Sequence, residues 1–132
     1  MTGLAYIDSS ALVKLVVREH ETAALENDLA HREALLCSRL GATELRRACA
    51  RARHARLLQH LDEVLDSIYL VEVTPAILEA AGRLTPSALR TLDAIHLATV
   101  QSFDEPVDLI TYDDRLAAAA KAHRLPVVRP GA

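Results

Sequence analysis

The sequence predicts an α/β protein in which a central parallel sheet of about five short strands is covered by helices on both faces. Short apolar segments alternate along the chain with longer segments whose apolar residues recur every three or four positions, as on one side of a helix. Strands separated by helices need right-handed crossovers, which make the strands parallel and place helices over the sheet. The 132 residues suit a single domain, 1–132, because no repeat, linker or low-complexity segment divides them.

Short apolar segments form the predicted strands. They lie at 4–7, 35–37, 69–73, 107–111 and 126–128. The predicted helices fill most of the chain between them, at 9–17, 21–30, 38 to about 53, 54–68, 74–84, 91–102 and 114–122. Two helix starts are signalled directly: Ser38 is a suitable N-cap, and Thr74 is an N-cap followed by Pro75 at the first helical position.

The composition is that of an ordinary globular protein. With 51% hydrophobic and 25% charged residues, it excludes a disordered or collagen-like chain. Two cysteines, Cys37 and Cys49, support neither a disulfide framework nor a cysteine-rich zinc site. The start of the chain carries no basic leader before an apolar stretch, and no apolar run approaches the ~20 residues that span a bilayer. We therefore expect a cytoplasmic protein with no membrane partner.

Acidic residues lie near the ends of the predicted strands. Asp8 directly follows the first strand, and Glu44 lies about two turns into the helix after the second. Asp93 opens the helix before the fourth strand, and Asp113 and Asp114 follow that strand. In open parallel α/β sheets ligands bind at the carboxyl ends of the strands. A parallel sheet can bring these acids together at that edge.

Each of these acids also has a purely structural explanation. Asp8 and Asp93 are suited to helix starts, Glu44 to a solvated helix face, and Asp113 to a turn. Their joint placement favours a shared site instead. Crowded carboxylates repel one another, so some must protonate or a cation must bind between them. Sites made of oxygen ligands select Mg²⁺ or Mn²⁺, and such ions support phosphodiester hydrolysis.

Four short segments carry a resemblance that covers essentially the whole chain. They read YIDSSAL at 6–12, ATEL at 42–45, LDAIHLA at 92–98 and ITYDDRL at 110–116. In this order and spacing they resemble the PIN domain, and more narrowly the VapC-type toxins of bacterial toxin–antitoxin pairs. The resemblance implies a PIN-like three-layer α/β/α sandwich and an Mg²⁺- or Mn²⁺-dependent ribonuclease. It also implies a cognate VapB-type antitoxin as partner and a homodimer.

The resemblance implies a set of site residues by motif match. The acidic residues that would bind metal and carry catalysis are Asp8, Glu44, Asp93 and Asp113. Ser9 and Thr111 fall where the family often places a supporting hydroxyl. Asp113 is favoured as the fourth acid because it follows Thr111 by two residues, and Asp114 is kept as a supporting alternative. One or two bound ions would activate a water for attack on a phosphodiester of single-stranded or looped RNA.

The net charge of −3 is a sum over unlike parts. Residues 32–56 contain seven arginines and two acids, a balance of +5, so the rest of the chain carries −8. Arg47 and Arg51 lie three and seven residues after Glu44, on its side of the predicted helix, and are candidate RNA-binding residues. The alternative is that this helix face is simply solvated.

His96, three residues after Asp93, is expected to have a structural role, with a ligand or acid role as the alternative.

Two other classes of function stay open. An aspartyl phosphoacceptor of the receiver type would need a lysine after the last strand, where Arg129 and Pro130 stand. A phosphatase of the haloacid-dehalogenase type would need a second aspartate at Ser10. The remaining class is a non-catalytic module that only binds RNA or protein. For such a module, metal chelation would leave RNA binding unchanged and no cleavage products would appear.

Overall fold

A parallel sheet of five strands forms the centre of the described structure, which is a computed structural model covering residues 2–51 and 55–132. The strands are β1 (Leu4–Ile7), β2 (Ala34–Ser38), β3 (Tyr69–Val71), β4 (Val107–Ile110) and β5 (Val127–Val128). Their order across the sheet is β3-β2-β1-β4-β5, and every pairing is parallel. The predicted parallel sheet of about five short strands is confirmed.

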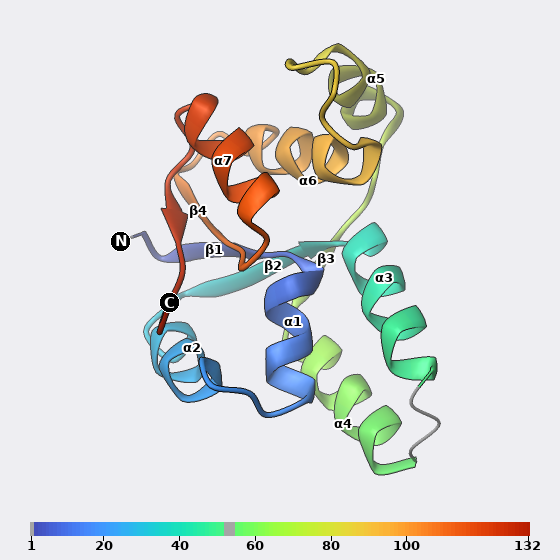
Figure 1. The fold of residues 1–132 in the computed structure, drawn as a ribbon, viewed down its shortest axis with the longest axis vertical. Helices are drawn as coiled ribbons and strands as arrows, with labels where there is room; N and C mark the ends of the chain where they lie inside the picture. The colour runs from blue at the N-terminus through green and yellow to red at the C-terminus, as the bar shows by residue number, and fades with distance from the viewer. Residues whose placement is uncertain (1, 52–54) are drawn as a thin grey trace.

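Helices cover both faces of this sheet (Figure 1). One layer contains α1 (Ser9–Val16), α2 (Thr22–Leu29), α3 (Arg39–Ala50) and α4 (Ala55–Asp66). The other contains α5 (Pro75–Arg83), α6 (Thr91–Gln101) and α7 (Asp114–Ala122). The chain changes layers when it returns from β3 to β4, and this change places the switch point of the topology between β1 and β4. The predicted three-layer α/β/α sandwich is confirmed.

The register of β1 and β4 positions the residues that follow them. Ile7 is paired with Ile110 at the ends of the two central strands. The amide of Asp8 donates to the carbonyl of Ile110 at 3.2 Å, which extends the pairing by one step. Asp8 and Thr111 therefore leave the sheet side by side. Alternating residues of these strands face opposite layers, so Tyr6 packs with α6 and α7 while Ile7 packs with the α1–α4 layer.

Side-chain caps fix where several helices begin. Asp8 caps α1, Ser38 caps α3, Thr74 caps α5 and Asp113 caps α7, each through a side-chain oxygen that accepts a backbone N–H. A cap of this kind stabilises a helix by about 1 kcal/mol. The caps predicted at Ser38 and Thr74 are thus confirmed. The predicted boundary near residues 53 and 54 lies outside the described residues, on either side of which α3 ends at Ala50 and α4 begins at Ala55.

A close approach at Gly41 holds α3 against the sheet. A Cβ at this position would overlap the Sγ atom of Cys37 on β2, so only glycine lets the helix lie this near. The approach brings the first turns of α3 close to the end of β2 and places Glu44, one turn further on, over the edge of the sheet. Separately, none of the described helices has the length and apolar character needed to cross a membrane.

The segment rich in arginine is not one continuous binding surface, contrary to what its +5 charge suggests. Arg32 has a fully buried side chain that forms ion pairs with Asp28 on α2 and Asp108 on β4. Arg39 and Arg46 are exposed, but each is paired with a carboxylate. Arg53 lies outside the described residues. Charge counting failed here because it does not distinguish a buried structural cation from an exposed one.

Candidate active site

Asp8 is the buried centre of the candidate site. Its side chain caps α1 by accepting the N–H of Ala11 at 3.0 Å, and the residue is only 3% exposed. The hydroxyl of Ser10 donates to Oδ1 at 2.7 Å and that of Thr111 donates to Oδ2 at 2.6 Å. Burial raises the pKa of Asp8, and these hydrogen bonds offset the rise only in part. Thr111 thus supports Asp8 as expected of a neighbouring hydroxyl.

The second supporting hydroxyl belongs to Ser10, whereas motif matching indicated Ser9. Ser10 also accepts the N–H of Tyr112 at 2.9 Å, so its hydroxyl ties the start of α1 to the segment after β4. Within the described residues Ser9 makes no side-chain hydrogen bond. The position of each serine explains why Ser10 and not Ser9 supports Asp8. Ser9 begins the helix, whereas Ser10, one residue later, donates back to the capping carboxylate. In the sequence, the spacing of two residues between Asp8 and Ser10 could have indicated this contact.

Asp113 is joined to Asp8 through Thr111. The amide of Asp113 donates to Oγ1 of Thr111 at 3.0 Å, and the Asp113 carboxylate caps α7 through Oδ1. Asp114 is directed elsewhere, because its side chain is 90% exposed and paired with Arg129. The structure therefore groups Asp113, and not Asp114, with the other acids.

Asp93 lies in the first turn of α6, facing the other two aspartates. Burial raises its pKa, and the negative charge of Asp113 raises it further, with a smaller contribution from Asp8. No side-chain hydrogen bond or ion pair within the described residues compensates this carboxylate. An uncompensated, half-buried acid beside two others is a group that a bound cation would stabilise.

Glu44 is held by a hydrogen-bonded chain that the sequence did not reveal. Nε2 of His96 lies 2.8 Å from the Glu44 carboxylate, and Nδ1 lies 2.7 Å from the hydroxyl of Tyr6. That hydroxyl also accepts the N–H of Ser38 at 3.1 Å. Burial raises the pKa of Tyr6, so its hydroxyl keeps its proton. His96 thus links the buried hydroxyl of Tyr6 to the carboxylate of Glu44.

This chain gives His96 the structural role expected of it. The residue is 2% exposed, and both of its ring nitrogens are engaged by protein groups. A metal would have to displace one of these partners to be bound by the imidazole. His96 therefore orients an acidic residue and leaves metal binding to carboxylates.

The donor set fits a hard divalent cation, although the carboxylates do not form a closed cage. Among the described residues, no group of three or more acidic, histidine or cysteine side chains is placed so that together they could hold a metal ion. Mg²⁺ usually keeps several of its waters and binds proteins through one or two carboxylates. Within the described residues, Asp93 has two carboxylate oxygens without a hydrogen-bond partner, and Asp113 and Glu44 have one each, which suits such a partly hydrated ion.

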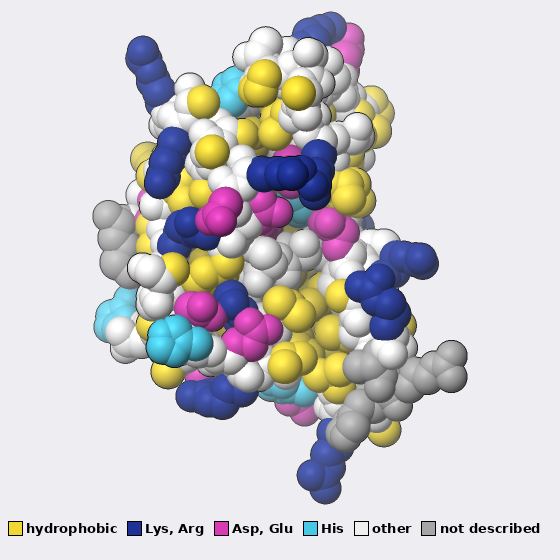
Figure 2. Space-filling model, in the orientation of Figure 1, with side chains coloured by type: hydrophobic (Ala, Val, Ile, Leu, Met, Phe, Trp, Pro, Cys, Tyr) yellow, Lys and Arg dark blue, Asp and Glu magenta, His cyan; other side chains and the backbone are white. Residues whose placement is uncertain are grey.

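The surface around this site is divided by charge. Figure 2 shows carboxylates gathered across the middle of one face, with cationic side chains close beside them. Arg47 on α3 and Arg51, the residue directly after that helix, are exposed and have no ion-pair partner within the described residues. They remain available for the RNA contact predicted from the sequence.

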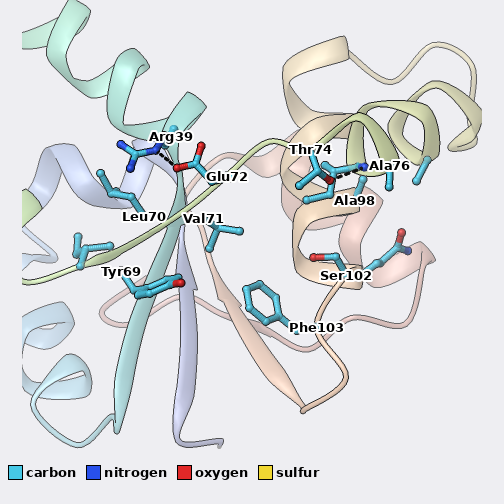
Figure 3. Close-up of a pocket in the computed structure, with 14 residues that line it drawn as sticks. Arg39, Tyr69, Leu70, Val71, Glu72, Thr74, Ala76, Ala98, Ser102 and Phe103 are labelled. Atoms are coloured by element: carbon cyan, nitrogen blue, oxygen red, sulfur yellow. Dashed lines mark hydrogen bonds and ion pairs between the residues drawn. The ribbon is translucent and has the colours of Figure 1, made fainter.

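A cavity of about 890 Å³ lies away from the acids, along β3 at the edge of the sheet. Figure 3 shows its rim, where Arg39 pairs with Glu72, and its wall, which includes Tyr69 and Phe103. None of the four candidate carboxylates lines it. The volume of a cavity therefore does not identify the candidate active site in this fold. The acidic residues at the edge of the sheet near β1 and β4 identify it.

Residues 5–122 match the family model of the PIN domain. The chain belongs to the PIN-domain family. Over 132 residues it is 44% identical to Ribonuclease VapC46 of Mycobacterium tuberculosis, with 95% of this chain and 96% of that protein covered. This PIN-domain protein is therefore a member of the VapC group.

Solved structures share the fold of this PIN-domain protein. The VapC20 toxin of Mycobacterium tuberculosis, described as cleaving the sarcin–ricin loop, superposes with a TM-score of 0.74 at 17% identity, covering 96% of this chain and 99% of that one. A toxin–antitoxin complex from Klebsiella pneumoniae gives a TM-score of 0.73 at 22% identity, covering 96% and 97%. At these identities the likeness supports the architecture alone.

Proposed function

We propose that this VapC-family protein is the toxin of a toxin–antitoxin pair and acts as a metal-dependent endoribonuclease. The observation that carries the proposal is the grouping of Asp8, Asp93 and Asp113, with Glu44 opposite, at the carboxyl edge of a parallel sheet. The chain also resembles a relative named a ribonuclease over nearly its whole length. Because RNA is the proposed substrate, the cytoplasm is the proposed place of action.

The four carboxylates are the proposed holders of Mg²⁺ or Mn²⁺. When bound, such an ion supplies an activated water and stabilises the negative charge that develops on the phosphoryl oxygens. Thr111 and Ser10 orient Asp8, and His96 orients Glu44, so that carboxylate oxygens face the same space. Arg47 and Arg51 are proposed to contact the phosphate backbone beside Glu44.

A cognate VapB-type antitoxin is the proposed inhibitory partner, and a homodimer is the proposed state of the toxin. Support for the antitoxin comes from the VapC group to which the chain belongs. An antitoxin would have to cover the acidic edge or block the approach of RNA to it.

The phosphoacceptor alternative is not favoured by the environment of Asp8. Both of its carboxylate oxygens accept hydrogen bonds from Ser10, Thr111 and the backbone, and the residue is nearly inaccessible. A nucleophilic carboxylate needs an exposed oxygen aligned with the phosphodonor. No second function is therefore proposed.

Metal removal tests the proposed function. We expect purified protein to cut end-labelled total RNA in the presence of Mg²⁺ or Mn²⁺, and an excess of EDTA to abolish the cuts. Mapping of the cut ends would identify the site of cleavage. If no metal-dependent product exceeds the background of an Asp93→Asn control, the chain is a binding module and the proposal is wrong.

A thermal measurement tests the metal site without relying on activity. The raised pKa of Asp93 means that folding disfavours its ionised form, so this carboxylate destabilises the folded state at neutral pH. We expect Asp93→Asn to raise the melting temperature at pH 7 by about 2 °C. The gain should vanish below the unfolded pKa of about 3.9, where the carboxyl is protonated in both states.

Mn²⁺ supplies the matched comparison. It should raise the melting temperature of the wild type by binding only the folded state, and should raise that of Asp93→Asn much less. Equal shifts in the two proteins would show that Asp93 takes no part in binding the ion.

A further inference from the structure

A second cavity adjoins the acidic cluster and has no role in the chemistry described so far. Its volume is about 440 Å³, and it lies between the segment that precedes α6 and the outer side of α7. Asp93 forms part of its wall, so the cavity lies beside one of the candidate carboxylates. Much of its lining is apolar, including Leu89 and the small side chains of Ala118 and Ala119.

Two exposed arginines also line this cavity. Arg90 immediately precedes α6, and Arg115 is the second residue of α7. Within residues 2–51 and 55–132 neither makes an ion pair or a side-chain hydrogen bond. The field at the start of a helix does not favour a cation. The fold therefore gains little from placing two guanidinium groups here.

The exposed arginines differ in their pairing. Arg39, Arg46 and Arg83 are each paired with a carboxylate, whereas Arg90 and Arg115, like Arg47 and Arg51, are not paired within the described residues. The larger cavity beside β3 likewise has its arginine neutralised by Glu72 (Figure 3). Uncompensated positive charge is thus combined with an apolar hollow at the cavity beside Asp93.

We propose that this cavity is a nucleotide subsite for the RNA strand, holding the nucleotide next to the phosphate that is cut. The inference rests on the proposed ribonuclease function and adds to it the residues that receive the substrate. Arg90 and Arg115 bind the flanking phosphate, since the planar guanidinium donates two parallel hydrogen bonds to phosphate oxygens. The apolar floor receives the adjoining base.

Charge supplies a further reason for such a subsite. A cluster of carboxylates repels the phosphate backbone that it has to approach, and one hydrated divalent ion only partly reverses this. Fixed cations beside the cluster lower the energy of the RNA exactly where the chain must come close. Arg90 also lies near enough to Asp93 for its charge to affect that carboxylate, although burial and Asp113 have the larger effects on the pKa of Asp93.

The test combines cleavage kinetics with binding of a labelled single-stranded RNA of mixed sequence, about 12 nucleotides long. Arg90→Gln with Arg115→Gln should lower kcat/KM by about 10–100-fold, mainly through a higher KM, and should reduce the salt dependence of binding. Binding is measured in the Asp8→Asn background, where the RNA stays intact. The matched control is Arg18→Gln with Arg83→Gln, which removes the same charge from exposed residues outside the site.

Ala118→Leu tests the apolar floor without changing the charge. It should fill the cavity, raise KM by about tenfold, and leave the salt dependence unchanged. If the variant without Arg90 and Arg115 shows the same kinetics as the control variant without Arg18 and Arg83, the nucleotide subsite is wrong. The cavity would then be a candidate surface for a protein partner. If Ala118→Leu alone has no effect, the base does not enter the cavity and that part is wrong. If the wild type itself cuts no RNA, the proposed function has failed instead.

Discussion

Replacement of Asp8 by asparagine is expected to reduce metal-dependent RNA cleavage by about 10³-fold while the protein stays folded. Charge stabilisation by a metal centre amounts to several kcal/mol in the transition state, and each 1.36 kcal/mol corresponds to about tenfold in rate. Asp8 is the buried carboxylate on which Thr111 and Ser10 converge, and a neutral amide at this position would hold a divalent ion poorly.

The fold should tolerate this change because the local hydrogen bonds can be rearranged. Asparagine caps helices about as well as aspartate, so the start of α1 is preserved. The amide nitrogen can donate to Thr111, whose hydroxyl can then turn toward Ser10, 3.3 Å away. Circular dichroism and a melting curve would check the fold, and the cleavage assay would check the activity.

Asp104→Asn is the matched control, since it removes one charge from an exposed loop between α6 and β4. It should cleave like the wild type. Cleavage by Asp8→Asn within a few-fold of this control would contradict the assignment of Asp8 to the metal site.

The sequence predicts the parts of this site that follow directly from strand ends. Asp8 and Asp113 come just after β1 and β4, and parallel strands necessarily bring such residues to one edge. Thr111 was expected from the motif match, although the predicted strand 107–111 included it, whereas β4 ends at Ile110 and leaves Thr111 just beyond the strand. The order of strands across the sheet was not predicted, because it depends on which strands pair after the chain changes layers.

The hydrogen-bonded chain behind Glu44 could not be predicted from the sequence. It joins Tyr6, Ser38, Glu44 and His96, which are separated by up to 90 residues, and it depends on the orientation of one imidazole ring. Hydrophobic periodicity reports only that Tyr6 and His96 face inward. Which polar atoms then meet is decided by the packing of α3 and α6 against the sheet.

The arginines also show what the composition of a sequence cannot predict, namely which of these side chains are buried or paired. The sequence shows a charge balance of +5 over residues 32–56, yet Arg32 contributes to that balance from inside the fold. Arg90 and Arg115, which line the cavity beside Asp93, lie outside that segment. Burial and pairing, and not the number of arginines, decide which of them can meet RNA.

Loss of the partner of Arg32 is expected to have the largest effect on stability. Asp108→Asn should lower the free energy of unfolding by about 3–5 kcal/mol, because it leaves a fully buried guanidinium with only Asp28 to balance it. A domain of this size is stable by only about 5–15 kcal/mol in total. A urea titration would measure the change.

The exposed pair of Arg46 and Asp62 provides the control. Both side chains are more than half exposed, and Asp62→Asn should cost less than about 1 kcal/mol. If Asp108→Asn and Asp62→Asn have the same free energy of unfolding, the buried pair of Arg32 and Asp108 does not stabilise the fold as proposed. Replacement of both partners by apolar residues, as in Arg32→Met with Asp108→Leu, should recover much of the loss because no buried charge is then left alone.

The dependence of stability on pH distinguishes the ion pair from simple packing at the same place. Burial is the largest single influence on the pKa of Asp108 and would raise it, but the hydrogen bonds from Arg32 and from the amide of Thr2, together with the charge of Arg32, outweigh burial and hold the pKa below its usual range. The contribution of Asp108 is therefore complete above the unfolded pKa of about 3.9, and is lost as the pH falls through the lower folded pKa. Asp108→Asn lacks this contribution at every pH. The difference in stability between wild type and variant should accordingly be large at pH 7 and shrink steadily below pH 4, whereas a packing defect would leave it constant.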